Sequence, residues 1–196
     1  MNKRLLVAFL LVTFPLFAQQ EPDHEIHQEL RGILTTVQEA INSGNYAAML
    51  PVVSEDLRAT TITQELIQGR KGVVPYFTKW FGPGGYLKKL DMELSADDLT
   101  ELSADKSWGI VVGTATEGYT LSDGRRFPMK SRWTATVVKE SDGRWRLRAI
   151  HFGTNFLENP IRTETENAAK RYTVMGVVGG LLLGLGLGFV VGRRKR

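Results

Sequence analysis

Cysteine is absent from this 196-residue chain. The chain therefore has no disulfide framework, no cysteine metal site, no thiol nucleophile and no cysteine that could carry a lipid anchor. The Gly-rich loop of phosphate-binding sites, the HExxH helix of metalloproteases and the serine-centred elbow of hydrolases are also missing. No short motif assigns a reaction to this sequence, and none assigns a metal or a cofactor.

A dense basic patch is also lacking, although the isoelectric point is about 9.4. Six of the 25 Lys and Arg residues lie within the first four and the last four positions, and all 21 Asp and Glu residues lie between Glu21 and Glu166. The middle of the chain is therefore slightly acidic. Nucleic-acid binders gather cations on one surface, so we expect no nucleic-acid partner.

The N-terminal segment has the pattern of a secretory signal. Lys3 and Arg4 precede a mostly apolar segment of 13 residues, and Ala18 follows it. This order predicts a signal peptide over residues 1–18 with cleavage after Ala18. The alternative is an uncleaved signal anchor, but 13 residues form a helix of only ~20 Å, which is short for a bilayer.

Near the other end, residues Thr173 to Gly192 are uncharged and precede a basic tail, 193–196. As a helix this stretch would be ~30 Å long, the thickness of a bilayer's hydrocarbon core. We predict a single-pass transmembrane helix over 173–192, after a juxtamembrane stem over 160–172. The Lys and Arg residues that flank membrane spans concentrate on the cytoplasmic side. The tail is thus expected in the cytoplasm and the domain outside it, which is the periplasm if the cell is Gram-negative.

Small residues recur at every fourth position of the predicted span, at Gly176, Gly180, Gly184, Gly188 and Gly192. Such spacing forms a groove along a membrane helix that lets a second helix approach closely. One interpretation is a homodimer held by this groove. The other is a monomeric anchor, because glycine is common in membrane helices.

The domain over residues 19–159 begins with helical periodicity. Ile26, Leu30 and Ile33 start an apolar stripe that continues to Gly44, and we expect Asp23 to cap this helix. A second, short helix is predicted after Asn45, which we expect to cap it. A strand over Leu57–Thr63 precedes a third helix, about Lys71–Phe81.

The period then changes from helix to strand. Alternating apolar residues predict strands over Leu90–Ala96, Trp108–Leu121, Phe127–Lys139 and Trp145–Phe156, and Asp-Gly pairs join the last three. Three helices followed by an antiparallel meander indicate an α+β fold. We expect the helices to cover one face of a curved sheet that closes a cone-shaped pocket.

GNYAAMLPVVSEDL, GRKGVVPYFTKWF and DGRWRLRAIHFGTNF, in this order, resemble the SnoaL-like branch of the nuclear transport factor 2-like superfamily. The resemblance covers about Glu25 to Phe156. It implies a small-molecule pocket, no cofactor, and functions that range from ketosteroid isomerases, cyclases and dehydratases to modules without chemistry. In the resembled isomerases a carboxylate base stands where this chain has Thr60. The nearest acids are Asp56 and Glu65, so the isomerase mechanism loses its base.

His151 is the leading candidate for chemistry. It shares strand parity with Trp145 and Leu147, and the resemblance implies that it faces the cavity. It could serve as a catalytic acid or base, contact a ligand, or be a packed structural histidine. The full set of predicted pocket residues is Tyr76, Trp80, Thr114, Tyr119, Trp133, His151 and Asn155.

Two further placements follow from spacing. Trp133 is expected on the core face of its strand, which puts Arg132 on the outer face. His24 and His27 lie three residues apart near a helix start, where we expect exposed groups and no metal site, since no third ligand is near.

The sequence therefore predicts a membrane-anchored domain that binds a small apolar or amphipathic molecule. One alternative is an isomerase-, cyclase- or dehydratase-type enzyme that uses His151. Another is a non-catalytic module that dimerises through its sheet face or through the glycine groove.

Overall fold

The computed structural model describes residues 22–194, except for the side chains of 161, 188–192 and 194. The first element, α1 (His24–Ser43), buries Leu30, Ile33 and Ile41 along one side, as the helical spacing predicted. It ends at Gly44, whose φ of 72° suits a residue without a Cβ atom. Asp23 precedes the helix but makes no capping bond. Its carboxylate pairs with Lys106 instead.

Short 3-10 helices flank the first two strands. η1 (Tyr46–Val52) is the predicted second helix, and the side chain of Asn45 before it accepts no capping hydrogen bond. η2 (Arg70–Gly72) leads into α2 (Val73–Phe81), where Pro75 falls in the tolerated first turn. The rings of Tyr46 and Phe77 stack with centroids 4.3 Å apart, so η1 and α2 pack as one unit against the sheet.

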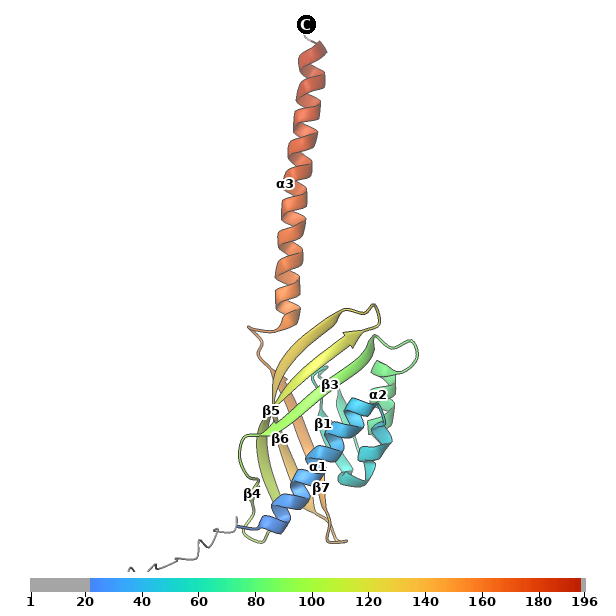
Figure 1. Cartoon of the computed structure of the whole chain (residues 1–196), viewed down its shortest axis with the longest axis vertical. Helices are drawn as coiled ribbons and strands as arrows, with labels where there is room; N and C mark the ends of the chain where they lie inside the picture. Colours follow the sequence, from blue (N-terminus) through green and yellow to red (C-terminus); the bar gives the residue numbers. More distant parts are fainter. Residues whose placement is uncertain (1–21, 195–196) are drawn as a thin grey trace, which may run out of the picture.

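Seven strands form one sheet: β1 (Val53–Thr60), β2 (Leu66–Gln68), β3 (Leu87–Ala96), β4 (Glu101–Leu102), β5 (Trp108–Leu121), β6 (Arg126–Lys139) and β7 (Trp145–Thr154). Their order is β2-β1-β7-β6-β5-β3, with β4 beside β5. The helices α1 and α2 lie on the same side of this curved sheet (Figure 1). The prediction of an all-antiparallel sheet is wrong, because β1 and β7 pair in parallel. No hairpin joins these two strands, so the turn signals that predicted the meander do not fix their direction.

The two Asp-Gly hairpins are confirmed. Gly124 and Gly143 have φ values of 86° and 79°, which glycine adopts at little cost. The carboxylates of Asp123 and Asp142 accept hydrogen bonds from the backbone N–H groups two residues later. These turns set the register of β5, β6 and β7, so that alternate side chains face the helices or solvent.

β6 follows that alternation: Trp133 is buried and Arg132 is exposed beside Asp97, as predicted. β7 does not. Its register against β6 shifts, so that Thr136 lies opposite Ala149 while Val137 lies opposite Leu147. Arg148 is the extra residue of this bulge.

α3 (Pro160–Arg194) includes the predicted stem and rises away from the domain (Figure 1). No helix in the described part of the chain is long and apolar enough to cross a membrane. The transmembrane prediction is therefore not confirmed. Five residues of the predicted span, 188–192, have side chains outside the described set, and these include Gly188 and Gly192. The predicted signal peptide, 1–18, also lies outside it. A Cβ atom added at Gly176, Gly180 or Gly184 would meet no atom within 4 Å.

Candidate functional site

Two adjoining cavities lie between the helices and the inner face of the sheet. The outer pocket, about 440 Å³, lies between α1 and strands β3, β5 and β6. The inner cavity, about 100 Å³, lies between α2, β1 and the middle of the sheet. Val37, Leu147 and Ile150 contribute to the walls of both. The interior of the cone is thus divided into two compartments.

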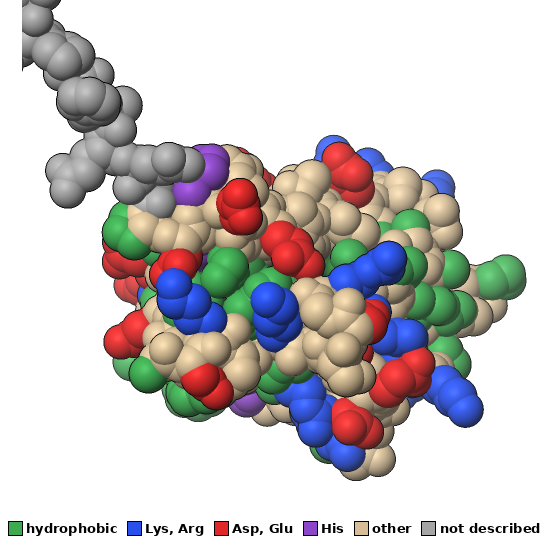
Figure 2. Space-filling model, turned by 90° about the horizontal axis from the view of Figure 1, so that it is seen from below, with side chains coloured by type: hydrophobic (Ala, Val, Ile, Leu, Met, Phe, Trp, Pro, Cys, Tyr) green, Lys and Arg blue, Asp and Glu red, His purple; other side chains and the backbone are tan. Residues whose placement is uncertain are grey.

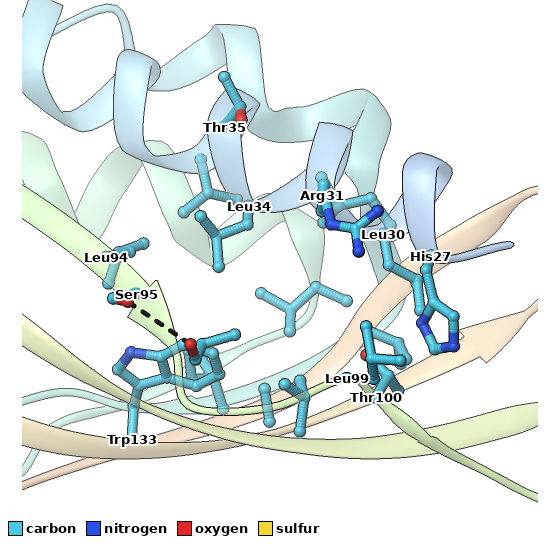
Figure 3. A pocket seen from close by; sticks show the side chains of 18 of the residues that line it. His27, Leu30, Arg31, Leu34, Thr35, Leu94, Ser95, Leu99, Thr100 and Trp133 are labelled. Carbon is cyan, nitrogen blue, oxygen red and sulfur yellow. Dashed lines mark hydrogen bonds between the residues drawn. The ribbon is translucent and has the colours of Figure 1, made fainter. Parts of the chain in front are cut away.

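The outer pocket has an apolar floor. Leu34 from α1 faces Trp133 from β6 across the space (Figure 3), and Ala135 and Val137 continue the floor along β6. The Trp133 indole nitrogen donates to the backbone carbonyl of Thr114 at 2.9 Å. This bond holds the ring flat over Gly113, where a side chain would not fit. Aliphatic and aromatic walls of this kind favour an apolar ligand.

Polar side chains surround the space above that floor. His27, Arg31 and Thr35 follow one another at four-residue spacing on α1, while Ser95, Asp98 and Thr100 approach from the opposite wall. Figure 3 shows the His27 ring and the Arg31 guanidinium directed from α1 into the pocket. At the end of the domain opposite α3, Lys and Arg side chains are interspersed with Asp and Glu (Figure 2).

The inner cavity contains a buried carboxyl group. Glu117 on β5 is only 2% exposed. Its Oε1 accepts a hydrogen bond from Ser131 Oγ at 2.5 Å, and its Oε2 accepts one from Tyr119 Oη at 2.6 Å. Apolar side chains such as Leu90 and Met92 surround the cluster. No cation contacts Glu117 among the described residues, so hydroxyl groups alone solvate it.

Burial is the main influence on this cluster's ionisation. It raises the pKa of Glu117 above its ordinary value of 4.5, while the two hydroxyl bonds pull in the opposite direction more weakly. Burial and the neighbouring Glu117 both raise the pKa of Tyr119. The cluster can therefore keep a proton on Glu117 at a pH where an exposed glutamate has lost it.

A short turn closes one side of the inner cavity. Thr61, Ile62 and Thr63 line the cavity, and Thr63 Oγ1 lies 3.3 Å from Tyr76 Oη. Glu65 ties the turn to α2.

The Glu65 carboxylate accepts hydrogen bonds from Lys79 Nζ at 2.7 Å and from Trp80 Nε1 at 2.8 Å. Trp80 therefore fastens the turn and lines neither cavity.

The predicted pocket residues separate into two groups. Tyr76 and Tyr119 line the inner cavity, and Trp133 lines the outer pocket. Thr114, His151 and Asn155 are exposed and line neither, so their predicted placement is wrong. Thr114 shares the solvent side of β5 with Trp108, not the core side.

Asn155 lies beyond the end of β7, where its Oδ1 accepts from two backbone N–H groups. His151 is displaced by the bulge at Arg148. After it, Ile150 and Phe152 take the inner positions and His151 points outward.

Two functional candidates escaped the sequence reasoning. His27 was expected to be exposed, yet it is only 6% exposed and lines the outer pocket. Its spacing of three residues to Leu30 on the buried stripe was the available signal. Glu117 shares strand parity with Ala115 and Tyr119, which could have marked an acid on the core face.

In the described part of the chain, no three His, Asp or Glu side chains are grouped as metal ligands would be.

Comparison with known proteins shows the fold. No family model matches the chain, and no curated protein matches it. Among solved structures, a ketosteroid isomerase-like protein from Erwinia carotovora atroseptica is similar with a TM-score of 0.56 and 13% identity, over 66% of this chain and 96% of its own.

A hexachlorocyclohexane dehydrochlorinase gives a TM-score of 0.56 at 10% identity, over 66% of this chain and 84% of its own. A nuclear transport factor 2-like protein from Salmonella enterica gives 0.54 at 12%, over 67% and 92%.

Proposed function

We propose that this domain binds a small apolar or amphipathic molecule in the outer pocket. The observation that carries the proposal is a space of about 440 Å³ with an apolar floor and polar groups on the walls around it. Ligand pockets typically measure about 300–1,000 Å³ and combine a mostly apolar lining with a few polar groups that orient the ligand. The outer pocket meets both conditions.

The similar structures support a binding role without specifying a ligand. One is named as a ketosteroid isomerase-like protein and another as a hexachlorocyclohexane dehydrochlorinase. At identities of 10–13% they share the fold, and a fold does not determine a reaction. The ligand must therefore be argued from this chain's own lining residues.

Adjacent residues on β5 offer a matched test. Val111 lines the outer pocket, whereas Val112 is exposed on the opposite face of the same strand. We expect Val111→Phe to fill the pocket and reduce affinity for a neutral probe, 4-phenylbutanol, by about tenfold, since tenfold is only about 1.4 kcal/mol. Val112→Phe should bind like the wild type. Calorimetry on the full chain in lipid nanodiscs, with empty nanodiscs as a blank, measures both.

Unchanged affinity in a folded Val111→Phe variant would exclude the outer pocket as the site. The same conclusion would follow if the wild-type chain gave no heat beyond the blank. Either result refutes the proposal.

A second candidate function is proton-transfer catalysis of the isomerase, cyclase or dehydratase type. Glu117 favours it, because a buried carboxyl with a raised pKa can hold a proton at a pH where an exposed glutamate has lost it, and can pass that proton on. Tyr119 would share that proton through its 2.6 Å bond. In this mechanism any turnover is lost in Glu117→Gln and kept in His151→Ala. The reverse pattern would identify His151, and not Glu117, as the catalytic acid or base.

We also propose that the domain works attached to a membrane, with its C-terminus in the cytoplasm. The uncharged run 173–192 and the basic tail support this. In addition, α3 exposes large apolar side chains that no part of the described chain covers, among them Leu181, Leu183 and Leu185. Exposed apolar area on this scale usually marks an interaction surface. A protein that alkaline carbonate releases from membranes, or a reporter after Arg196 found outside the cytoplasm, would contradict the proposal.

Association into a homodimer has two candidate surfaces. The outer face of β5 exposes Trp108, Ile110 and Val112, and α3 carries the glycine groove. If the groove holds two chains together, Gly180→Ile with Gly184→Ile reduces self-association in membranes. If association is unchanged, the groove is not the contact.

A further inference from the structure

His27 is a buried polar side chain without a partner among the described residues. Only 6% of the residue is exposed. Its backbone N–H bonds to Asp23, but its ring makes no hydrogen bond to the described residues. The ring nitrogens can therefore still take a hydrogen-bond partner.

The ring nitrogens of His27 open toward the outer pocket. No fully enclosed side-chain nitrogen or oxygen lacks a partner in the described part of the chain, so the unpaired ring must reach open space. Figure 3 shows that space: the ring points away from α1, toward Thr100 and the pocket. The missing partner therefore belongs in the pocket.

Arg31 brings a permanent positive charge to the same end. It lies one helical turn after His27 and also lines the pocket (Figure 3). A guanidinium only donates hydrogen bonds, and a neutral or charged imidazole can donate one as well. Two donors on one helix face, one of them always cationic, favour an anionic acceptor.

We propose that the outer pocket takes an amphipathic monocarboxylate. Its carboxylate binds between His27 and Arg31, and its apolar body lies on Trp133 and the neighbouring aliphatic floor. This inference rests on the proposed function and specifies the ligand class for the same pocket.

A single negative charge fits the lining better than a phosphate or another polyanion. Asp98, the one acidic side chain that lines the outer pocket among the described residues, stands on the opposite wall. It would repel a second negative charge, and Arg31 is the one Lys or Arg side chain of that described lining to balance it. The apolar floor requires the rest of the ligand to be hydrocarbon, which inorganic anions lack.

A pair of probes with the same apolar body tests the class. 4-Phenylbutyrate carries the carboxylate, and 4-phenylbutanol replaces it with a hydroxyl. We expect the full chain in nanodiscs to bind the acid about tenfold more tightly than the alcohol, since one hydrogen-bonded charge typically contributes that factor or more. His27→Phe should reduce affinity for the acid to that of the alcohol, while affinity for the alcohol changes little.

His24→Phe is the matched control, because His24 lies one turn earlier on α1 and does not line the pocket. Asp98→Asn should move affinity for the acid in the opposite direction, upward, by removing repulsion. Equal affinities for the two probes would overturn the carboxylate assignment and leave the proposed function standing. Failure of both probes to bind would instead refute the proposed function. An acid preference that survives in His27→Phe would also overturn the assignment.

Discussion

The outer pocket and the inner cavity each contain one buried titratable side chain, and the two differ in their hydrogen-bond partners. Glu117 in the inner cavity has both oxygens occupied by hydroxyl groups of its own chain. His27 in the outer pocket has no side-chain partner among the described residues. Both residues are at most 6% exposed, so exposure alone does not distinguish them.

This difference teaches where a ligand is needed. A polar cluster whose hydrogen bonds are all made stabilises one arrangement of the core, and a ligand would add few hydrogen bonds to it. An unsatisfied group at the edge of an open pocket gains a hydrogen bond when a ligand arrives. The cavity volumes also favour the outer pocket as the ligand site, since it is the larger of the two. Three changes separate the two compartments experimentally.

Gly113→Ala should have the largest effect and should damage the outer pocket. A Cβ atom there would overlap both the carbonyl oxygen of Ser95 and the ring of Trp133. Backbone and ring must shift, which we expect to lower the free energy of unfolding by roughly 1–3 kcal/mol. Urea denaturation followed by fluorescence measures the loss.

Gly118→Ala on the same strand is the control, because its Cβ atom would meet only Asp91 at an ordinary 3.8 Å. Its stability should equal that of the wild type or exceed it slightly. Equal losses in the two variants would show that Trp133 does not need the space over Gly113.

Glu117→Gln should produce a smaller, pH-dependent effect on the inner cavity. The pKa of Glu117 is raised in the folded chain, so between 4.5 and that raised value the folded state binds more protons than the unfolded state. Wild-type stability therefore falls as pH rises through this range, by at most about 1.4 kcal/mol per pH unit. The Glu117→Gln variant lacks this loss, so its stability should rise relative to the wild type from pH about 4.5 up to the raised pKa of Glu117.

Urea denaturation at several pH values measures the difference between the two curves. Glu93→Gln, at an exposed glutamate of β3, should keep a constant difference from the wild type. If the advantage of the Glu117→Gln variant shrinks with rising pH, then Glu117 is stabilised as a charged group.

Glu65→Ala should have the smallest effect and should loosen only the turn over the inner cavity. It removes the acceptor for Lys79 and Trp80, while the backbone bond from Thr61 N–H to the residue-65 carbonyl remains. We expect backbone hydrogen exchange at 61–65 to accelerate by roughly threefold, because the turn opens locally more often. Exchange along the pocket-lining part of α1 should not change; an equal acceleration there would show that the two compartments open together.

Much of the fold followed from sequence because local rules governed it. The alternation in β5 and β6 and the Asp-Gly turns fixed register without reference to distant parts of the chain. The parallel β1–β7 pair could not be read this way, because no turn connects those strands.

The site was harder to predict, because single-residue events decided it. One bulged residue, Arg148, reversed the parity on which the placement of His151 depended. The burial of His27 and Glu117 depends on how α1 packs against the sheet. The local sequence of α1 or of β5 does not reveal that packing. Tyr119 and Trp133 were placed correctly on inner faces because no bulge intervenes between them and their turns.

The parallel pairing of β1 with β7 also has a kinetic consequence. Val53 lies opposite Leu147, so this contact must close a long stretch of chain that the hairpins do not shorten by themselves. Contacts of large sequence separation form slowly. During synthesis β1 can pair with β2, but its other edge must wait until β7 has been made. A chain interrupted before Trp145 leaves that edge of β1 open to other chains.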